Sequence, residues 1–336
     1  TGTAIGAGAY TVYLYNELVE KPLSIYPSEA AAQIKRALYY ASRGEVGDMA
    51  NAFKQAIQIA EQSGMHPLSD EVAGLKIECA QLLLKAKDGQ YAAKAVAILE
   101  HVLDEAYAGA EYFEKRSRWK DRNKVLKRAV LLGYKIGEMY QGLGKDDKAE
   151  EAMSWATETL LKEMKRREES KKREEENDED WFDSIATSAC FEKLAQHYER
   201  TAQYYLATPL YLKAVSLLPP KTCHAITLMN NIATTLSRQQ LPEGAESGKV
   251  TRAHLLDNAQ KWAEKALEMN AVVKPSVRTE ECDQACVAAT YNLGEIARML
   301  GDKKTAEGRL NEALSLAKRL GLEEGIEAAK EGLEQV

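Results

Sequence analysis

Cysteine and histidine are the residue types in this 336-residue chain best suited to redox, nucleophilic or metal chemistry, and the chain has five of each. The histidines are scattered, and none has a partner at the spacing of a zinc site or a catalytic triad. Cys282 and Cys286 form a C-x3-C pair on one face of an expected helix. A disulfide within one helical turn is strained. The cysteines are therefore either reduced or, in an oxidising compartment, Cys223 bonds to this pair.

Phosphate-binding and nucleic-acid-binding patterns are missing from the sequence. It contains neither G-x-x-x-x-G-K-[ST] nor a G-x-G-x-x-G that follows a strand. The formal net charge of -6 argues against the clustered basic face of a nucleic-acid-binding protein. We therefore expect no catalytic, cofactor or metal site and no nucleic-acid partner, so the chain is not expected to be an enzyme.

The helices that would position a binding site are visible as a recurring pattern. In its clearest copy, Leu293 and Gly294 open a first helix, Gly301 ends it, and Ala306 and Leu310 follow on a second helix. Similar copies cover residues 136–156 and 191–219. Small residues at this spacing allow two helices to cross closely, while large residues fill the space between pairs. Because no sustained period-two alternation occurs, the sequence predicts an all-α fold.

This helix–turn–helix pattern resembles that of tetratricopeptide (TPR) repeat proteins over about residues 28–320. One repeat cannot bury its own apolar face, so the resemblance implies an α-solenoid of about six stacked repeats. The array is expected over 28–336, with a capping helix at 322–335. Its repeats are longer and less regular than the family's usual repeat of roughly 34 residues. An apolar segment, 1–15, and a proline-containing linker, 16–27, precede the array.

The apolar segment 1–15 has two interpretations. It is too short to span a bilayer. Its glycines, alanines and tyrosines nevertheless resemble the last part of a membrane-anchor helix, with the tyrosines at the interface. Membrane association through this segment is one expectation. The other is an ordinary apolar helix that covers the first repeat.

A charged stretch at 162–180 is expected to continue the second helix of the third repeat. Glu163 and Arg167 are one of its acid-to-base pairs at i, i+4, a spacing that stabilises a helix. We expect this extension to project into solvent. The alternative is a dedicated contact surface for a partner.

In TPR proteins the first helix of each pair lines the concave face, so the resemblance implies a peptide-binding groove. The residues that the repeat register places there are Tyr134, Glu138, Gln196, Arg200, Asn230, Thr234, Tyr291, Glu295 and Arg298. Some family members clamp acidic chaperone tails with asparagines and lysines. Asn231 and Asn292 have the asparagine offset of this clamp, but Ile34 stands where a lysine is required. A chaperone-tail clamp is therefore not expected.

Within the family, the layout resembles the fungal mitochondrial inner-membrane TPR adaptor of the i-AAA protease. The shared elements are the apolar glycine-rich start, the proline-containing linker, the long irregular repeats and the charged helix. The resemblance implies localisation at the mitochondrial inner membrane, with the array in the intermembrane space. There the chain would be a protein-binding adaptor that takes peptide or unfolded segments to an AAA protease. The alternative is an assembly factor that binds one folded partner of a mitochondrial membrane complex. Without the anchor, a cytoplasmic location is expected.

Overall fold

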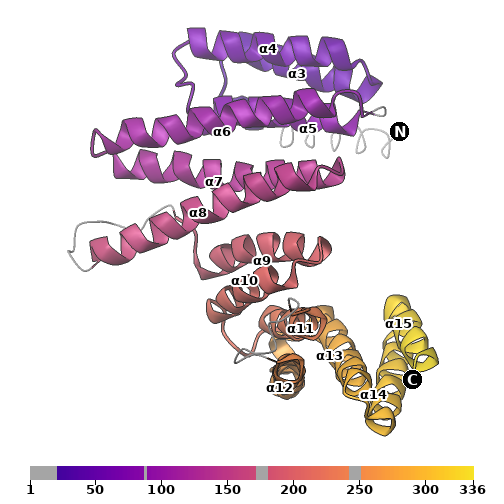
Figure 1. Cartoon of the computed structure of the whole chain (residues 1–336). Coiled ribbons are helices and arrows are strands. Elements are labelled where there is room, and N and C mark those ends of the chain that lie inside the picture. Colours follow the sequence, from indigo (N-terminus) through magenta and orange to yellow (C-terminus); the bar gives the residue numbers. More distant parts are fainter. Residues whose placement is uncertain (1–20, 87–88, 172–180, 242–250) are drawn as a thin grey trace. The chain divides into compact units, whose positions relative to one another are not determined.

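The computed structural model describes residues 21–86, 89–171, 181–241 and 251–336 (Figure 1). Every regular element in these ranges is a helix and none is a strand, so the predicted all-α fold is confirmed. The apolar segment 1–15 and residues 172–180 of the charged stretch lie outside the described ranges. Among the described helices, none has the length and apolar character needed to cross a membrane.

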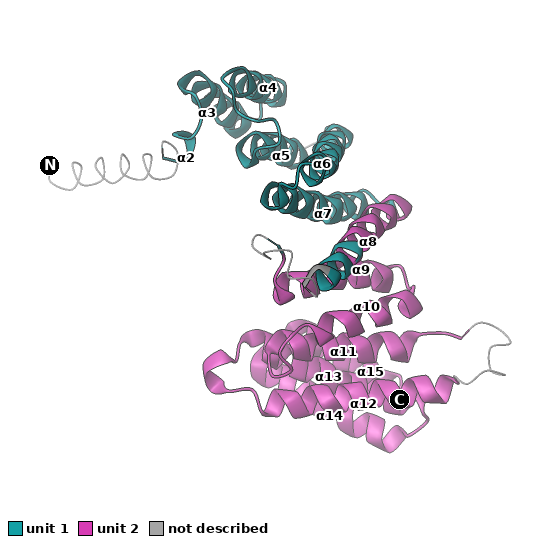
Figure 2. Ribbon diagram, turned by 90° about the vertical axis from the view of Figure 1, so that its left-hand side faces the viewer, with its two compact units in different colours: residues 1–145, 162–181 teal, residues 146–161, 182–336 magenta. Residues whose placement is uncertain are grey.

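The chain divides into two compact units (Figure 2). Unit 1 comprises residues 1–145 and 162–181, and unit 2 comprises 146–161 and 182–336, so helix α8 (Asp146–Lys171) contributes to both. The other helices of unit 1 are α2 (Lys21–Leu23), α3 (Ser28–Arg43), α4 (Val46–Gln62), α5 (Asp70–Lys85), α6 (Ala92–Glu114) and α7 (Trp119–Gly142). Those of unit 2 are α9 (Ser184–Arg200), α10 (Tyr204–Ser216), α11 (Cys223–Arg238), α12 (Arg252–Ala271), the short 3-10 helix η3 (Pro275–Val277), α13 (Glu280–Met299), α14 (Lys303–Leu320) and α15 (Glu323–Glu334).

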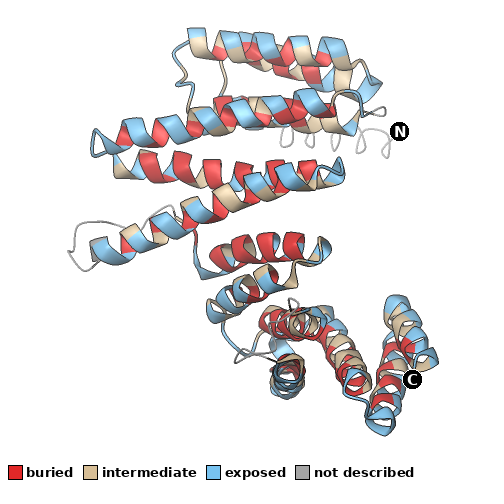
Figure 3. Cartoon of the chain, viewed as in Figure 1, coloured by how far each residue is buried: buried red, intermediate tan, exposed pale blue. Residues whose placement is uncertain are grey.

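Consecutive helices pack as hairpins, and the hairpins of a unit pack on one another. In unit 1 the hairpins are α3 with α4 and α5 with α6, and α7 packs on α6. In unit 2 the hairpins are α9 with α10, α11 with α12 and α13 with α14. The first helices α11 and α13 also contact each other directly, and α15 packs on α14 and α13. The helices of these hairpins therefore have a buried stripe and an exposed stripe (Figure 3).

Small residues occupy the close crossings that the repeat pattern predicts. Ala207, Ala263 and Ala306 are all fully buried, as the repeat register required. A Cβ added to Gly294 on α13 would lie 2.7 Å from Cγ of Leu310 on α14, a separation that real Cβ atoms do not adopt. Glycine at this position lets the two helices of the hairpin approach closely.

Several of the hairpin turns contain a residue with a left-handed backbone. Gly44 between α3 and α4 and Gly301 between α13 and α14 have φ values of 73° and 83°. In the α9–α10 turn this place is taken by Ala202, with φ 59°. An alanine in the left-handed region costs roughly 1–2 kcal/mol because its Cβ crowds the following carbonyl oxygen. This turn therefore carries backbone strain that the turns with glycine avoid.

The start of the charged stretch is only partly exposed to solvent, because one face of the helix is exposed at Lys162, Lys165 and Glu168 while the opposite face is buried. Glu163 and Arg167 form the predicted i, i+4 pair at 2.8 Å, but both are buried within unit 1. Arg122 on α7 and Arg166 also bind the Glu163 carboxylate, each at 2.7 Å. Burial alone would raise the pKa of Glu163, but hydrogen bonds from Arg166 and Arg122 outweigh it and lower the pKa. The guanidinium of Arg167 lies 4.5 Å from the centre of the Trp181 ring.

These contacts explain why the sequence pattern misled. A buried carboxylate is stable only when charged hydrogen-bond partners replace its lost water. The arginine on α7 that supplies part of this compensation is about 40 positions away in sequence, and local charge periodicity therefore gives no sign of it.

Candidate functional site

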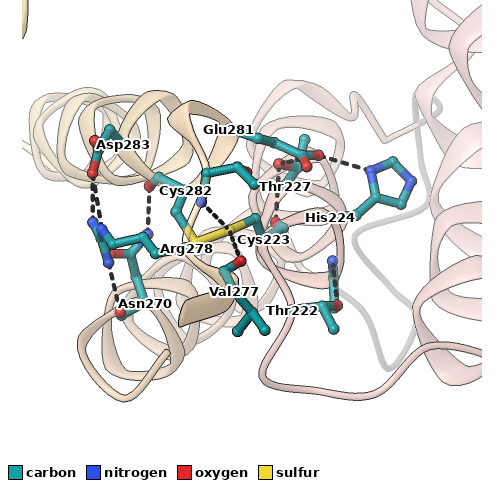
Figure 4. Close-up of a disulfide and its surroundings, with 12 residues drawn as sticks. Thr222, Cys223, His224, Thr227, Asn270, Val277, Arg278, Glu281, Cys282 and Asp283 are labelled. Atoms are coloured by element: carbon teal, nitrogen blue, oxygen red, sulfur yellow. Dashed lines mark hydrogen bonds and ion pairs between the residues drawn. A yellow bond between two sulfur atoms is a disulfide. The ribbon is translucent and has the colours of Figure 1, made fainter. Parts of the chain in front are cut away.

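The best-defined polar cluster of unit 2 lies along its first helices, α9, α11 and α13. The disulfide between Cys223, the first residue of α11, and Cys282 near the start of α13 joins two of these helices (Figure 4). Their Cα atoms are 4.6 Å apart, within the usual range for a disulfide. The sequence left open whether Cys223 bonds to the C-x3-C pair, and the structure gives this bond. Cys286, the other member of the pair, is free and half-buried.

Beside the disulfide, His224 bridges the two neighbouring first helices. Its Nε2 lies 2.9 Å from a carboxylate oxygen of Glu192 on α9, and its Nδ1 lies 2.8 Å from one of Glu281 on α13. Both ring nitrogens can donate only when the imidazole is protonated. The hydrogen bond to Glu192, followed by that to Glu281, outweighs partial burial and raises the pKa of His224 to about 9. At neutral pH the bridge is therefore a cation held between two carboxylates.

A second set of interhelical bonds lies further along α11 and α13. The side-chain amide of Asn292 donates to Oδ1 of Asn230 and to Oγ1 of Thr234, both at 2.8 Å. One more turn along α13, Arg298 pairs with Glu295 at 2.7 Å. The Arg298–Glu295 pair lies within α13, whereas the disulfide and the two bonds from Asn292 fix the spacing of α11 and α13. The side chains on this surface therefore need little reordering to meet a ligand.

The side chains on this surface combine an aromatic ring with polar groups. Tyr291 is half-buried, and burial, followed by the nearby Glu295 carboxylate, raises the pKa of its hydroxyl. Gln196 on α9 is exposed and donates to Glu192 at 3.1 Å. We call this surface the first-helix face. Its members are Gln196, His224, Thr234, Tyr291, Asn292, Glu295 and Arg298.

The residues that the sequence assigned to one groove belong to two different units. Tyr134 and Glu138 belong to unit 1, whereas the other seven belong to unit 2. Tyr134 is only 2% exposed, and Asn230 only 7%, so neither side chain offers a contact surface and both assignments need correction. Each residue fills the space between helices instead.

The remaining assigned residues keep at least part of their side chains accessible. Glu138 pairs with Lys135 at 3.3 Å, and Arg200 pairs with Asp146 at 2.5 Å at the far end of α9. Thr234, Tyr291, Glu295 and Arg298 fall within the first-helix face described above. That these residues bind a ligand stays a prediction.

The His224 bridge was missed at the level of sequence. His224 is 32 residues from Glu192 and 57 from Glu281. No local motif has such spacing. The one signal in the sequence that could have suggested their proximity is the repeat register, which assigns all three residues to first helices. In the described ranges, no group of three histidine, cysteine, aspartate or glutamate side chains is arranged to hold a metal ion.

Comparison with known proteins gives one curated relative and several structural likenesses. No family model matches the chain. A TPR repeat-containing protein of Schizosaccharomyces pombe is 28% identical over 285 residues, which is 82% of this chain and 69% of the relative. MamA from Desulfovibrio magneticus superposes with a TM-score of 0.43 at 13% identity, over 75% of this chain and 98% of MamA. The Rap protein complexed with competence and sporulation factor superposes with a TM-score of 0.42 at 15% identity, over 90% of this chain and 69% of the Rap chain.

The helix hairpins, the buried alanines at their crossings and the similarity to this TPR repeat-containing relative agree with one another, and they show a TPR-like helical-repeat fold.

Proposed function

We propose that this protein is a binding adaptor that takes up peptide or unfolded protein segments on the first-helix face of unit 2. The observation that carries the proposal is the preorganisation of that face. The Cys223–Cys282 disulfide, the charged His224 bridge and the hydrogen bond from Asn292 to Asn230 hold its helices in place. The half-buried Tyr291 and the paired Arg298 lie on the same face. Aromatic and arginine side chains carry much of the binding energy at protein interfaces.

A peptide array probed with the purified chain tests this proposal. Replacing Tyr291 and Arg298 together by alanine should weaken the signal of the retained peptides, because both side chains belong to the first-helix face. The matched control replaces Tyr205 on α10, which is exposed, and Arg309 on α14, which is partly exposed; both lie on second helices. The control should bind as the unaltered chain does. Equal losses in both variants, or no retained peptide at all, would refute the proposal.

We further propose that the adaptor works at the mitochondrial inner membrane and delivers substrates to the i-AAA protease. Two observations support this. The layout of the sequence resembles that adaptor, and the Cys223–Cys282 bond suits an oxidising compartment such as the intermembrane space. The chain should then co-purify with the protease and shorten the lifetime of an unfolded reporter in mitochondria. Recovery of one stable membrane complex, without binding to unfolded models, would favour an assembly factor instead.

A further inference from the structure

A pocket of about 620 Å³ lies between α13 and the start of α15 in unit 2. Val287 and Tyr291 line it from α13, and Leu322 and Ala328 line it from the α15 side. Tyr291 also belongs to the first-helix face, so the pocket continues that face toward the end of the chain. Its apolar lining suits a buried side chain of a bound segment.

The α15 wall of this pocket is held firmly in place. A Cβ on Gly325 would lie 3.1 Å from Val287 on α13 and 3.2 Å from Ala317 on α14. One on Gly332 would lie 2.9 Å from Leu310. Glycine at both positions therefore brings the α15 backbone into close contact with both neighbouring helices. The α15 side of the pocket is therefore held in position by close packing against α13 and α14.

Acidic side chains determine the charge of the pocket. Glu323 and Glu324 both line it and both are exposed. Their place in the first turn of α15 favours negative charge, because the helix dipole is positive there. Glu327 follows one turn later and is also exposed.

In the part of the chain that the structure describes, Glu323 and Glu324 are not engaged in ion pairs, although Lys318 and Arg319 are exposed at the end of the preceding helix α14. Arg278 is bound to Asp283 at 2.6 Å, and Arg298 is bound to Glu295 at 2.7 Å. The pocket thus joins apolar walls to two carboxylates that have no ion-pair partner in the described ranges.

We infer that this pocket binds an extended segment of a partner protein in which an aliphatic side chain stands next to lysine or arginine. The aliphatic group would fill the space between Val287 and Leu322, and the cation would pair with Glu323 or Glu324. Like charges repel across an interface, so an acidic segment is rejected by the same carboxylates. The inference rests on the proposed peptide-binding function and specifies which segments are recognised.

Fluorescence anisotropy with two labelled peptides tests the inference. The probe is an acetylated nonapeptide of alternating leucine and lysine, and its counterpart has glutamate in place of every lysine. The unaltered chain should bind the lysine peptide at least tenfold more tightly than the glutamate peptide at 0.15 M salt. Raising the salt to 0.5 M should weaken the binding of the lysine peptide, since exposed charges are screened.

Two variants locate the binding on this pocket. Glu323→Lys with Glu324→Lys should lower the affinity for the lysine peptide about tenfold or more. The matched control, Glu268→Lys on α12 with Glu307→Lys on α14, makes the same charge change at exposed positions outside the pocket. It should lower the affinity less than threefold. Ala288→Leu, which fills the pocket without changing charge, should weaken the peptide as well. Circular dichroism confirms that each variant is folded.

The outcomes separate this inference from the proposed function. Equal losses in the pocket and control variants would mean that the peptide responds only to net charge and would overturn the inference. Preference for the glutamate peptide, or for uncharged array peptides, would overturn it while leaving the adaptor function intact. If no peptide of any composition binds, both the inference and the proposed function fail.

Discussion

Removing the Cys223–Cys282 disulfide is expected to destabilise unit 2 substantially. The bond joins residues 59 positions apart, and it closes a loop that contains the whole α11–α12 hairpin. For a loop of this length the chain-entropy relation gives about 14 cal/mol/K, or about 4 kcal/mol at 25 °C. Because α11 and α13 already pack side by side, removing the bond should give the native state little extra conformational freedom. Nearly all of the estimated loss should therefore appear as a lower free energy of unfolding.

Urea denaturation followed by circular dichroism measures this effect. The oxidised chain is compared with the Cys223→Ala, Cys282→Ala double variant, and the transition of unit 2 should move to lower urea. Cys286→Ala is the matched control, because it removes a half-buried thiol from the same helix without opening the loop. It should cost less than about 1 kcal/mol, the usual range for mild substitutions.

A reductant provides the internal check. It should shift the transition of the unaltered chain and leave that of the double variant in place. Oxidised chain and double variant unfolding within about 0.5 kcal/mol of each other would refute the reasoning, since that difference lies far below the loop estimate.

Three further predictions concern the repeat architecture. Ala202→Gly should stabilise the chain by about 0.5–1 kcal/mol, because glycine relieves the left-handed strain and loses only part of that gain to its greater chain entropy; a lower melting temperature would contradict it. Ala207→Leu should destabilise unit 2 by roughly 1–3 kcal/mol through overpacking, whereas Ala97→Leu at an exposed site of α6 should have little effect in thermal melts. The raised pKa of His224 means that its contribution to stability is complete below about pH 6.5 and is lost as the pH rises toward 9; urea midpoints for the chain and for His224→Gln should therefore converge over that interval, and parallel curves would rule this out.

The repeat pattern predicted the hairpins because the residues that each hairpin requires are close together in the sequence. A small residue is needed wherever two helices cross, and a left-handed turn residue is needed between them. Ala306 and Gly301 meet these needs within a dozen residues of each other, so the sequence displays both.

The site was less predictable because its parts come from different hairpins. The sequence could place Tyr291 and Arg298 on a first helix, but it could not reveal that Asn230 lies buried beneath Asn292. Burial depends on how far neighbouring hairpins rotate against each other, and irregular repeats make that rotation variable. The buried Glu163 illustrates the same limit, since its charge partner on α7 lies outside the local pattern.

Hydrogen–deuterium exchange with and without the tightest peptide from the array tests the central claim most directly. If segments bind on the first-helix face, exchange should slow in α11, α13 and the first turns of α15, and hardly change in the second helices α10, α12 and α14. Slowed exchange confined to the second helices, or found only in unit 1, would contradict the account.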